Sequence, residues 1–147
     1  MTCFFIGHRH VPAALRAKLG EAVERHITEY SVTEFVVGHY GQFDKMAAGV
    51  VRDARKRHRQ VTLMLLLPYY PYHQVRIPED YDATFYPEGM EFVPKSAAIV
   101  RANRYMVQSS SFLICYNAKR VGNTRDIVEF ALRREKKGLI RVTNLAE

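Results

Sequence analysis

Short apolar runs alternate with helical patterns along the chain, and this alternation restricts the choice of fold more than any other feature. The strand-like runs are short and largely apolar: 2–6, 35–37, 61–67, 112–116 and 139–142, with a short extra strand at 84–86. Between them, apolar residues recur every three or four positions, as along one face of a helix: 12–30, 43–54, 98–107 and 124–137. Strict alternation of strands and helices predicts a mainly parallel sheet with helices on both faces.

The length of the chain fits one domain of this kind. Of its 147 residues, 48% are hydrophobic and 25% are charged, a balance that excludes disordered and collagen-like chains. No repeat or linker interrupts the pattern. We therefore expect residues 1–147 to form a single three-layer, Rossmann-like α/β domain with a sheet of five or six strands. The first helix is expected to have Pro12 at its first position.

The cysteines and the apolar runs bear on the compartment. Cys3 and Cys115 lie inside apolar runs without a Cys-x-x-Cys pair, which favours buried, reduced thiols. The first six residues lack the basic leader and cleavage site of a secretory signal. The longest apolar run, 61–67, is far shorter than the ~20 residues of a membrane helix. We expect a soluble, cytoplasmic protein with no membrane partner.

The net charge points to the kind of partner. Lys and Arg exceed Asp and Glu by enough to give a charge of +7, which favours a ligand that carries phosphate, either a small nucleotide or a polymer. The densest basic runs, 55–59 and 133–137, fall at the ends of helical patterns, where cations complement the helix dipole. No aromatic residues interleave with them as a groove for single-stranded nucleic acid would require. A small ligand is therefore favoured over a polymer.

Three glycine-bearing turns follow expected strands and open expected helices: Gly7-His8-Arg9, residues 38–44 and Gly122-Asn123-Thr124. In an open parallel sheet, ligands bind beyond the carboxyl ends of the strands. Helix starts offer free backbone N–H groups there, and glycine lets a phosphate approach the backbone. With Arg9 beside them, these turns suit an anionic, nucleotide-like ligand.

Each of these features also has an interpretation in which it serves the fold and binds no ligand. The glycines also suit tight turns without a ligand, Asn123 or Thr124 suits a helix N-cap, and Asp44 suits the first turn of a helix. His8 and His39 lack the spacing and the nearby carboxylates of a metal site, so no metal and no cofactor are expected. The proline-rich, aromatic stretch 68–94 supplies Tyr69, Tyr70 and Tyr72, which suit either base stacking or packing of a folded loop.

Three segments, in their order and spacing, resemble the YpsA-like group of the SLOG superfamily, which is named for the Smf/DprA and LOG proteins: residues 3–9, 37–44 and 101–107. The resemblance covers nearly the whole chain. It implies a Rossmann-like fold that binds nucleotides or nucleotide-derived signals, such as relatives of ADP-ribose, at the strand ends. Members of the superfamily include phosphoribohydrolases, ligand-sensing domains of antiviral systems and a DNA-binding recombination mediator.

Matched position by position, the resemblance implies a set of ligand-binding residues: Gly7, His8, Arg9, Gly38, Gly41, Phe43, Asp44, Arg101, Asn103, Arg104, Gly122, Asn123 and Thr124. One departure concerns catalysis. The related hydrolases carry a glutamate that takes part in cleavage of the glycosidic bond, and this chain has Ile127 in that slot. Without that carboxylate, the group best suited to activate water is missing. Ligand binding therefore ranks above hydrolysis.

Three functions follow from these observations. The leading one is recognition of a small nucleotide or an ADP-ribose-like ligand, with Arg9 on phosphate and Asp44 on ribose hydroxyls, in a sensing or regulatory role. The second is hydrolysis of an N-glycoside by Asp44, Asp126 or Glu129. The third is binding of single-stranded nucleic acid through the positive charge. SLOG relatives often self-associate, so the resemblance also allows a homo-oligomer.

Overall fold

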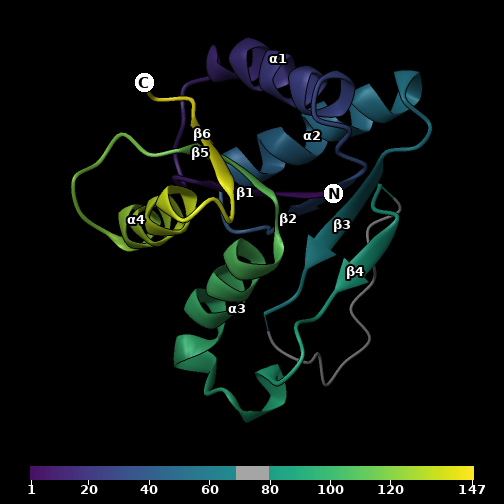
Figure 1. Cartoon of the computed structure of the whole chain (residues 1–147). Helices are drawn as coiled ribbons and strands as arrows, with labels where there is room; N and C mark the ends of the chain where they lie inside the picture. The colour runs from purple at the N-terminus through teal and green to yellow at the C-terminus, as the bar shows by residue number, and fades with distance from the viewer. Residues whose placement is uncertain (69–79) are drawn as a thin grey trace.

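The computed structural model describes residues 1–68 and 80–147, and within them the chain forms one six-stranded parallel sheet flanked by four α-helices (Figure 1). The strands are β1 Thr2–Gly7, β2 Glu34–Val37, β3 Thr62–Leu66, β4 Ala83–Phe85, β5 Phe112–Tyr116 and β6 Arg141–Asn144. The helices are α1 Leu15–Thr28, α2 Gln42–Arg57, α3 Lys95–Ser109 and α4 Asn123–Lys136, with a 3₁₀ turn, η1, at Met90–Phe92. The three-layer, Rossmann-like architecture expected from the alternating pattern is confirmed.

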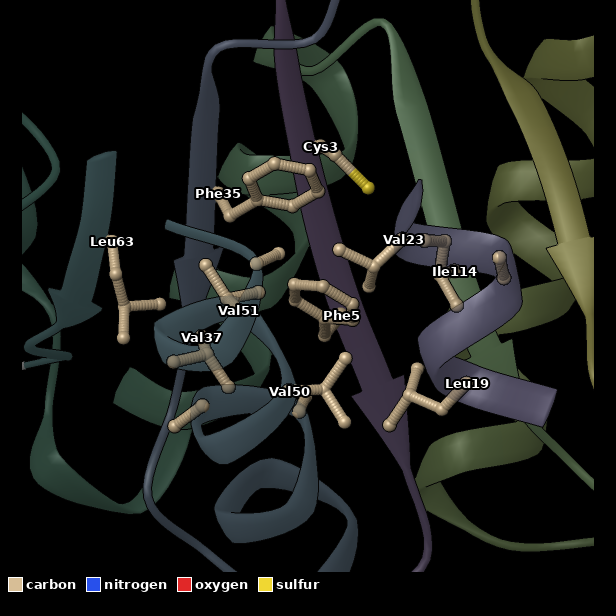
Figure 2. Close-up of a cluster of buried hydrophobic side chains, with 14 of the residues drawn as sticks. Cys3, Phe5, Leu19, Val23, Phe35, Val37, Val50, Val51, Leu63 and Ile114 are labelled. Carbon is tan, nitrogen blue, oxygen red and sulfur yellow. The ribbon is translucent and has the colours of Figure 1, made fainter. Parts of the chain in front are cut away.

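The central strand β1 is apolar on both faces because helices cover both sides of the sheet (Figure 1). Cys3 and Phe5 point toward the layer of α1 and α2, where Phe5 stacks on Phe35 with ring centroids 5.8 Å apart (Figure 2). Phe4 and Ile6 point the other way, toward α3 and α4. Strands buried on both faces have continuous rather than alternating apolar sequences, which is why these runs were recognisable.

The strand order β4-β3-β2-β1-β5-β6 locates the edge at which a ligand would bind. The chain moves outward from β1 through β2, β3 and β4, and then returns to place β5 on the other side of β1. The loop that follows β1 therefore leads to α1 on one face of the sheet, and the loop that follows β5 leads to α4 on the other face. We call the side of the sheet where the strands end the carboxyl edge.

The first helix and the last strand begin later than the sequence predicts. The first helix begins at Leu15 rather than at Pro12, because residues 12–15 form a turn in which the Leu15 N–H donates to the Pro12 carbonyl over 3.1 Å. The last strand is Arg141–Asn144 rather than 139–142. Leu139 instead follows Gly138, whose φ of 74° is left-handed, and it is 51% exposed.

The extra strand and the cysteines agree with expectation. β4 occupies 83–85, one residue before the expected position, and pairs in parallel with β3. Cys3 and Cys115 are buried free thiols, and burial raises the pKa of Cys115 to about 12. None of the described helices is long and apolar enough to cross a membrane.

Candidate functional site

The loops after β1 and β2 are joined through Arg9 and the start of α2. The Gln42 N–H donates to the Arg9 carbonyl over 2.9 Å, and the Val11 N–H donates to Gln42 Oε1 over 3.0 Å. Gly41 faces the same backbone so closely that a Cβ there would lie 2.6 Å from the Arg9 Cα. This approach explains why position 41 is glycine, since any side chain would push the two loops apart.

The loops after β1 and β5 are joined through His8, the residue before Arg9. The Ala118 N–H donates to His8 Nε2 over 2.9 Å, and the His8 ring lies edge-on to Tyr116 at 5.8 Å. His8 is buried, and that burial, together with the nearby Lys119 charge, lowers the pKa of its imidazole. Since Nε2 accepts a hydrogen bond, the neutral ring carries its proton on Nδ1.

Asn117 continues this connection toward β6. Its N–H donates to Asn144 Oδ1 over 3.1 Å, and Asn144 Nδ2 donates to the Asn117 carbonyl over 3.3 Å. The Asn117 side chain is 6% exposed, and its Oδ1 finds no hydrogen-bond partner in the part of the chain that the structure describes. Sequence reasoning missed Asn117 because a single asparagine after a strand carries no motif.

Asp44 occupies the first turn of α2 and is buried beside the end of β2. Its Oδ2 accepts a 3.0 Å hydrogen bond from the Tyr40 N–H and lies 3.1 Å from the point where a Cβ of Gly38 would stand. Burial raises the pKa of this carboxyl to about 6, against the opposing effect of the Tyr40 hydrogen bond. A carboxyl of this kind can accept hydrogen bonds from hydroxyls and exchange a proton near neutral pH.

Gly7 and Phe43 support the turns from beneath. Phe43 is fully buried and contacts Phe5 with ring centroids 6.4 Å apart. It packs directly over Gly7, where an added Cβ would lie 2.6 Å from the Phe43 Cβ. The structure thus places Phe43 in the core below the loops.

Exposed basic side chains surround the three joined loops. Arg9 is exposed, and no ion pair to it is found among residues 1–68 and 80–147. The same loops carry further exposed basic or imidazole side chains: His10, His39, Lys119 and Arg120. As far as the described residues show, the Arg9 guanidinium can pair with an anionic group of a ligand.

The third glycine turn opens α4 without a side-chain cap. Gly122 itself is the N-cap, with a φ of 114° that favours glycine, and neither Asn123 nor Thr124 caps the helix. The alternative in which one of these two residues serves as the N-cap is therefore wrong. The N–H groups of the first turn of α4 have no side-chain acceptor in the part of the chain that the structure describes, and they lie at the carboxyl edge.

The α3 residues that the resemblance implied lie apart from the joined loops. The Arg104 guanidinium stacks on the ring of Phe130 in α4, 4.7 Å from its centroid. Arg101 is exposed and Asn103 is half-buried, both midway along the helix. The structure does not join these three residues to the loops after β1, β2 and β5. Tyr69, Tyr70 and Tyr72 lie outside the described residues.

The carboxylates considered for hydrolysis differ in their surroundings. Glu129 accepts a 2.7 Å hydrogen bond from Arg125 one turn earlier, and Asp126 is exposed. Ile127, in the glutamate slot of the related hydrolases, is buried in the core beneath α4. Of the three candidates, Asp44 alone is buried at the carboxyl edge.

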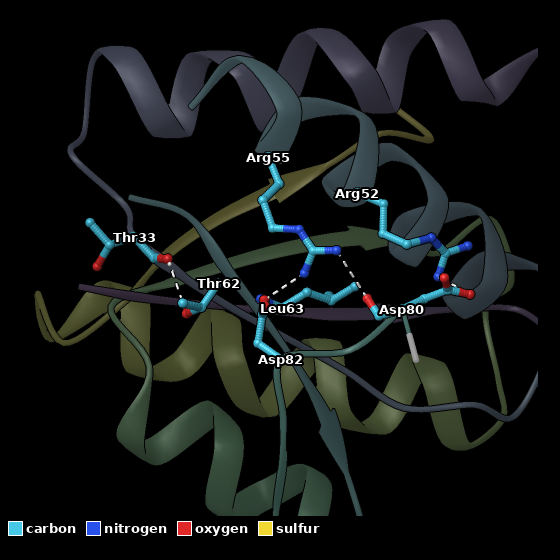
Figure 3. Close-up of polar contacts among 7 residues, drawn as sticks. All are labelled: Thr33, Arg52, Arg55, Thr62, Leu63, Asp80 and Asp82. Atoms are coloured by element: carbon cyan, nitrogen blue, oxygen red, sulfur yellow. Dashed lines mark hydrogen bonds and ion pairs between the residues drawn. The ribbon is translucent and has the colours of Figure 1, made fainter. Parts of the chain in front are cut away.

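Several residues of the basic run 55–59 pair with acidic residues of this chain. Arg55 pairs with Asp82 at 2.6 Å, as Figure 3 shows, while Arg57 and His58 both pair with Glu24. Within the described ranges, no cluster of His, Cys, Asp and Glu could hold a metal ion.

Comparison with known proteins bears on the fold. No protein-family model matches the chain, and no characterised protein matches it by sequence. Among solved structures, it is similar to DNA processing protein A from Helicobacter pylori, described for its single-stranded DNA binding mode. The TM-score is 0.55 at 11% identity, and the match covers 99% of this chain and 76% of that one. This similarity supports the Rossmann-like fold that the SLOG resemblance implied.

Proposed function

We propose that this protein binds a phosphate-bearing, nucleotide-type ligand at the carboxyl edge, between the loops that follow β1, β2 and β5. One observation carries the proposal: His8 and Arg9 join three strand-end loops, while the Arg9 guanidinium has no ion-pair partner among the described residues. A fixed backbone with an unpaired cation at a topological switch point suits an anionic ligand.

Each part of the site has a role in this proposal. Arg9 pairs with phosphate oxygens, and the first-turn N–H groups of α4 add further donors. Asp44 accepts hydrogen bonds from ribose hydroxyls, which suits a mononucleotide or an ADP-ribose-like molecule. Membership of the YpsA-like group is part of the same proposal and rests on residues 3–9, 37–44 and 101–107.

A thermal-shift panel tests the site. Nucleoside monophosphates, nucleoside diphosphates, NAD and ADP-ribose should include at least one ligand that raises the melting temperature. The shift should disappear in Arg9→Ala and persist in Arg59→Ala, which removes an exposed arginine from the opposite end of α2. No shift across the panel, or equal loss in both variants, would overturn the proposal. Chromatography of the same mixtures for free base tests hydrolysis.

Single-stranded nucleic acid is the second candidate. Two observations favour it: the structural similarity to DNA processing protein A, which is described for its single-stranded DNA binding mode, and the net charge of +7. The two candidates differ in their response to salt. For a polymer, the logarithm of the binding constant should fall with the logarithm of the salt concentration, with a slope of about 0.7 per phosphate contact. The affinity of a site with one or two phosphate contacts should respond to salt much less. Titration of a labelled oligonucleotide at several salt concentrations separates them.

A further inference from the structure

We propose that His39 and Tyr40 form a stacking platform for a nucleobase, so that the ligand of this site carries a base and is not simply a sugar phosphate. This inference rests on the proposed function and assigns its base subsite. The two rings are stacked, with centroids 4.7 Å apart and planes inclined by 27°. They belong to the loop after β2, one of the three loops at the carboxyl edge.

Tyr40 is the anchored member of the pair. Its N–H donates to Asp44 Oδ2 over 3.0 Å, which ties the residue to the first turn of α2. Its ring lies against the end of β2, since a Cβ on Gly38 would be 3.0 Å from Tyr40 Cδ2. Contacts on the backbone and on the ring therefore hold this side chain in one orientation.

His39 is the outward member of the pair. Its side chain is exposed, whereas Tyr40 is half-buried beneath it. Neither residue belongs to the two hydrophobic cores defined among the described residues. An aromatic ring held in place at the surface offers a π-face, which every nucleobase can stack on.

The platform adjoins the proposed phosphate group. Gly41, directly after Tyr40, contacts the Arg9 backbone, and Gln42 donates its N–H to the Arg9 carbonyl. The loop that carries the rings is therefore fixed to Arg9, whose guanidinium has no ion pair within residues 1–68 and 80–147. Nucleotide-binding surfaces combine aromatic rings with cations, because the rings recognise the base and the cation recognises the phosphate.

Calorimetric titration with two phosphate-matched probes tests the platform. The probes are adenosine 5′-monophosphate and ribose 5-phosphate, which differ only in the base. Adenosine monophosphate should bind roughly tenfold more tightly than ribose 5-phosphate, as expected for one stacked base. His39→Ala should remove that difference without changing the affinity for ribose 5-phosphate, and His39→Phe should restore it. In proton NMR, the base protons should move upfield on binding to the wild-type protein and to His39→Phe only.

The outcomes distinguish the two proposals. If both probes bind alike and both depend on Arg9, the platform is wrong and the phosphate site remains. If His39→Ala weakens both probes equally, His39 acts on the loop and not on the base, which also overturns the platform. If neither probe binds the wild-type protein at millimolar concentration, both the platform and the proposed function for these ligands fail.

Discussion

Charged residues near the two ends of helix α2 differ in whether they have a partner of opposite charge among the described residues. At its C-terminal end, Arg55 pairs with Asp82 at 2.6 Å, and the same carboxylate oxygen accepts the Leu63 N–H at 2.7 Å (Figure 3). At its N-terminal end, Asp44 is buried with one backbone hydrogen bond and no ion pair among the described residues. Arg9 stands exposed on the adjoining loop, also unpaired within that part of the chain.

This contrast separates charges that hold the fold together from charges that are available to a ligand. Asp82 has both of its partners inside the protein, so it fixes the start of β4 against α2 and β3. Asp44 is buried without such compensation, which costs stability. Proteins keep uncompensated groups of this kind mainly at functional sites.

Asp44→Asn should stabilise the protein at neutral pH and flatten its dependence on pH. A carboxyl whose pKa is raised by folding binds its proton more tightly in the folded state, so its contribution to stability falls as pH rises from 3.8 through about 6. Asparagine retains an acceptor for the Tyr40 N–H and carries no charge. The gain in unfolding free energy at pH 7.5 should approach about 3 kcal/mol and vanish near pH 4.

Urea denaturation of the two proteins at pH 4, 5, 6 and 7.5 measures this effect. The stability curves of wild type and Asp44→Asn should converge at the acidic end. Curves that stay parallel across this range would show that burial of Asp44 does not cost stability. The same variant should bind the nucleotide ligand more weakly, because a neutral amide accepts ribose hydroxyls less strongly than a carboxylate does.

Asp82 contacts the C-terminal end of α2, the end opposite Asp44. Asp82→Ala should lower the free energy of unfolding by about 2 kcal/mol. The Leu63 N–H, on a fully buried residue, would lose its acceptor at the same time as Arg55 loses its partner. Asp82→Asn is the matched control, because it retains an acceptor and removes only the charge of a half-exposed pair. Its cost should stay below about 1 kcal/mol by denaturant unfolding. Equal costs for the two variants would mean that the ion pair, and not the backbone hydrogen bond, carries the stabilisation.

Gly41→Ala should cost about 1.5 kcal/mol, because the new methyl group would meet the Arg9 Cα and force the two loops apart. The φ of Gly41 is −176°, so the backbone itself would not resist alanine. Gly20→Ala, within α1 and with open space around it, should stabilise by about 0.5–1 kcal/mol. If the melting temperatures of Gly41→Ala and Gly20→Ala move in the same direction, this account of the joined loops is wrong.

Glu24→Gln should have the smallest effect, about 0.5 kcal/mol, because Arg57 is exposed to solvent and the pair with His58 is only part-buried. The hydrogen bond from His58 is the main cause that lowers the pKa of Glu24, and Arg57 adds to it. A carboxyl whose pKa is lowered by folding stabilises the protein at pH values above its ordinary pKa, which is 4.5 for Glu24. That stabilisation is lost as the pH falls below 4.5. Chemical denaturation at pH 7 and at pH 3.5 should show the difference only at pH 7.

The elements with continuous apolar sequences were the ones that could be predicted. The strand at 112–116 was placed correctly because it is buried on both faces. The final strand was placed two residues early because Leu139 extends its apolar run in the sequence, although Leu139 is exposed. Leu132 belongs to the helical pattern 124–137 and is likewise 38% exposed. Apolar residues at the margins of a core carry no signal of which side they face.

The position of the glycine turns in the fold was predictable, but the contacts between them were not. The glycine turns could be assigned to the carboxyl edge because every strand of a parallel sheet ends there. The hydrogen bond from Ala118 to His8 joins residues 110 positions apart, and no local pattern encodes it. The contact of Gly41 with Arg9 likewise depends on how tightly β1 and β2 pack side by side.

The contact between Gly41 and Arg9 has a consequence for the thermodynamics of recognition. Loops that are wedged together have already lost their conformational entropy during folding, so a ligand does not have to order them on arrival. Association should therefore proceed with little structural rearrangement, and its favourable enthalpy should not be offset by a large entropic penalty. Loops that are preorganised in this way trade adaptability for selectivity.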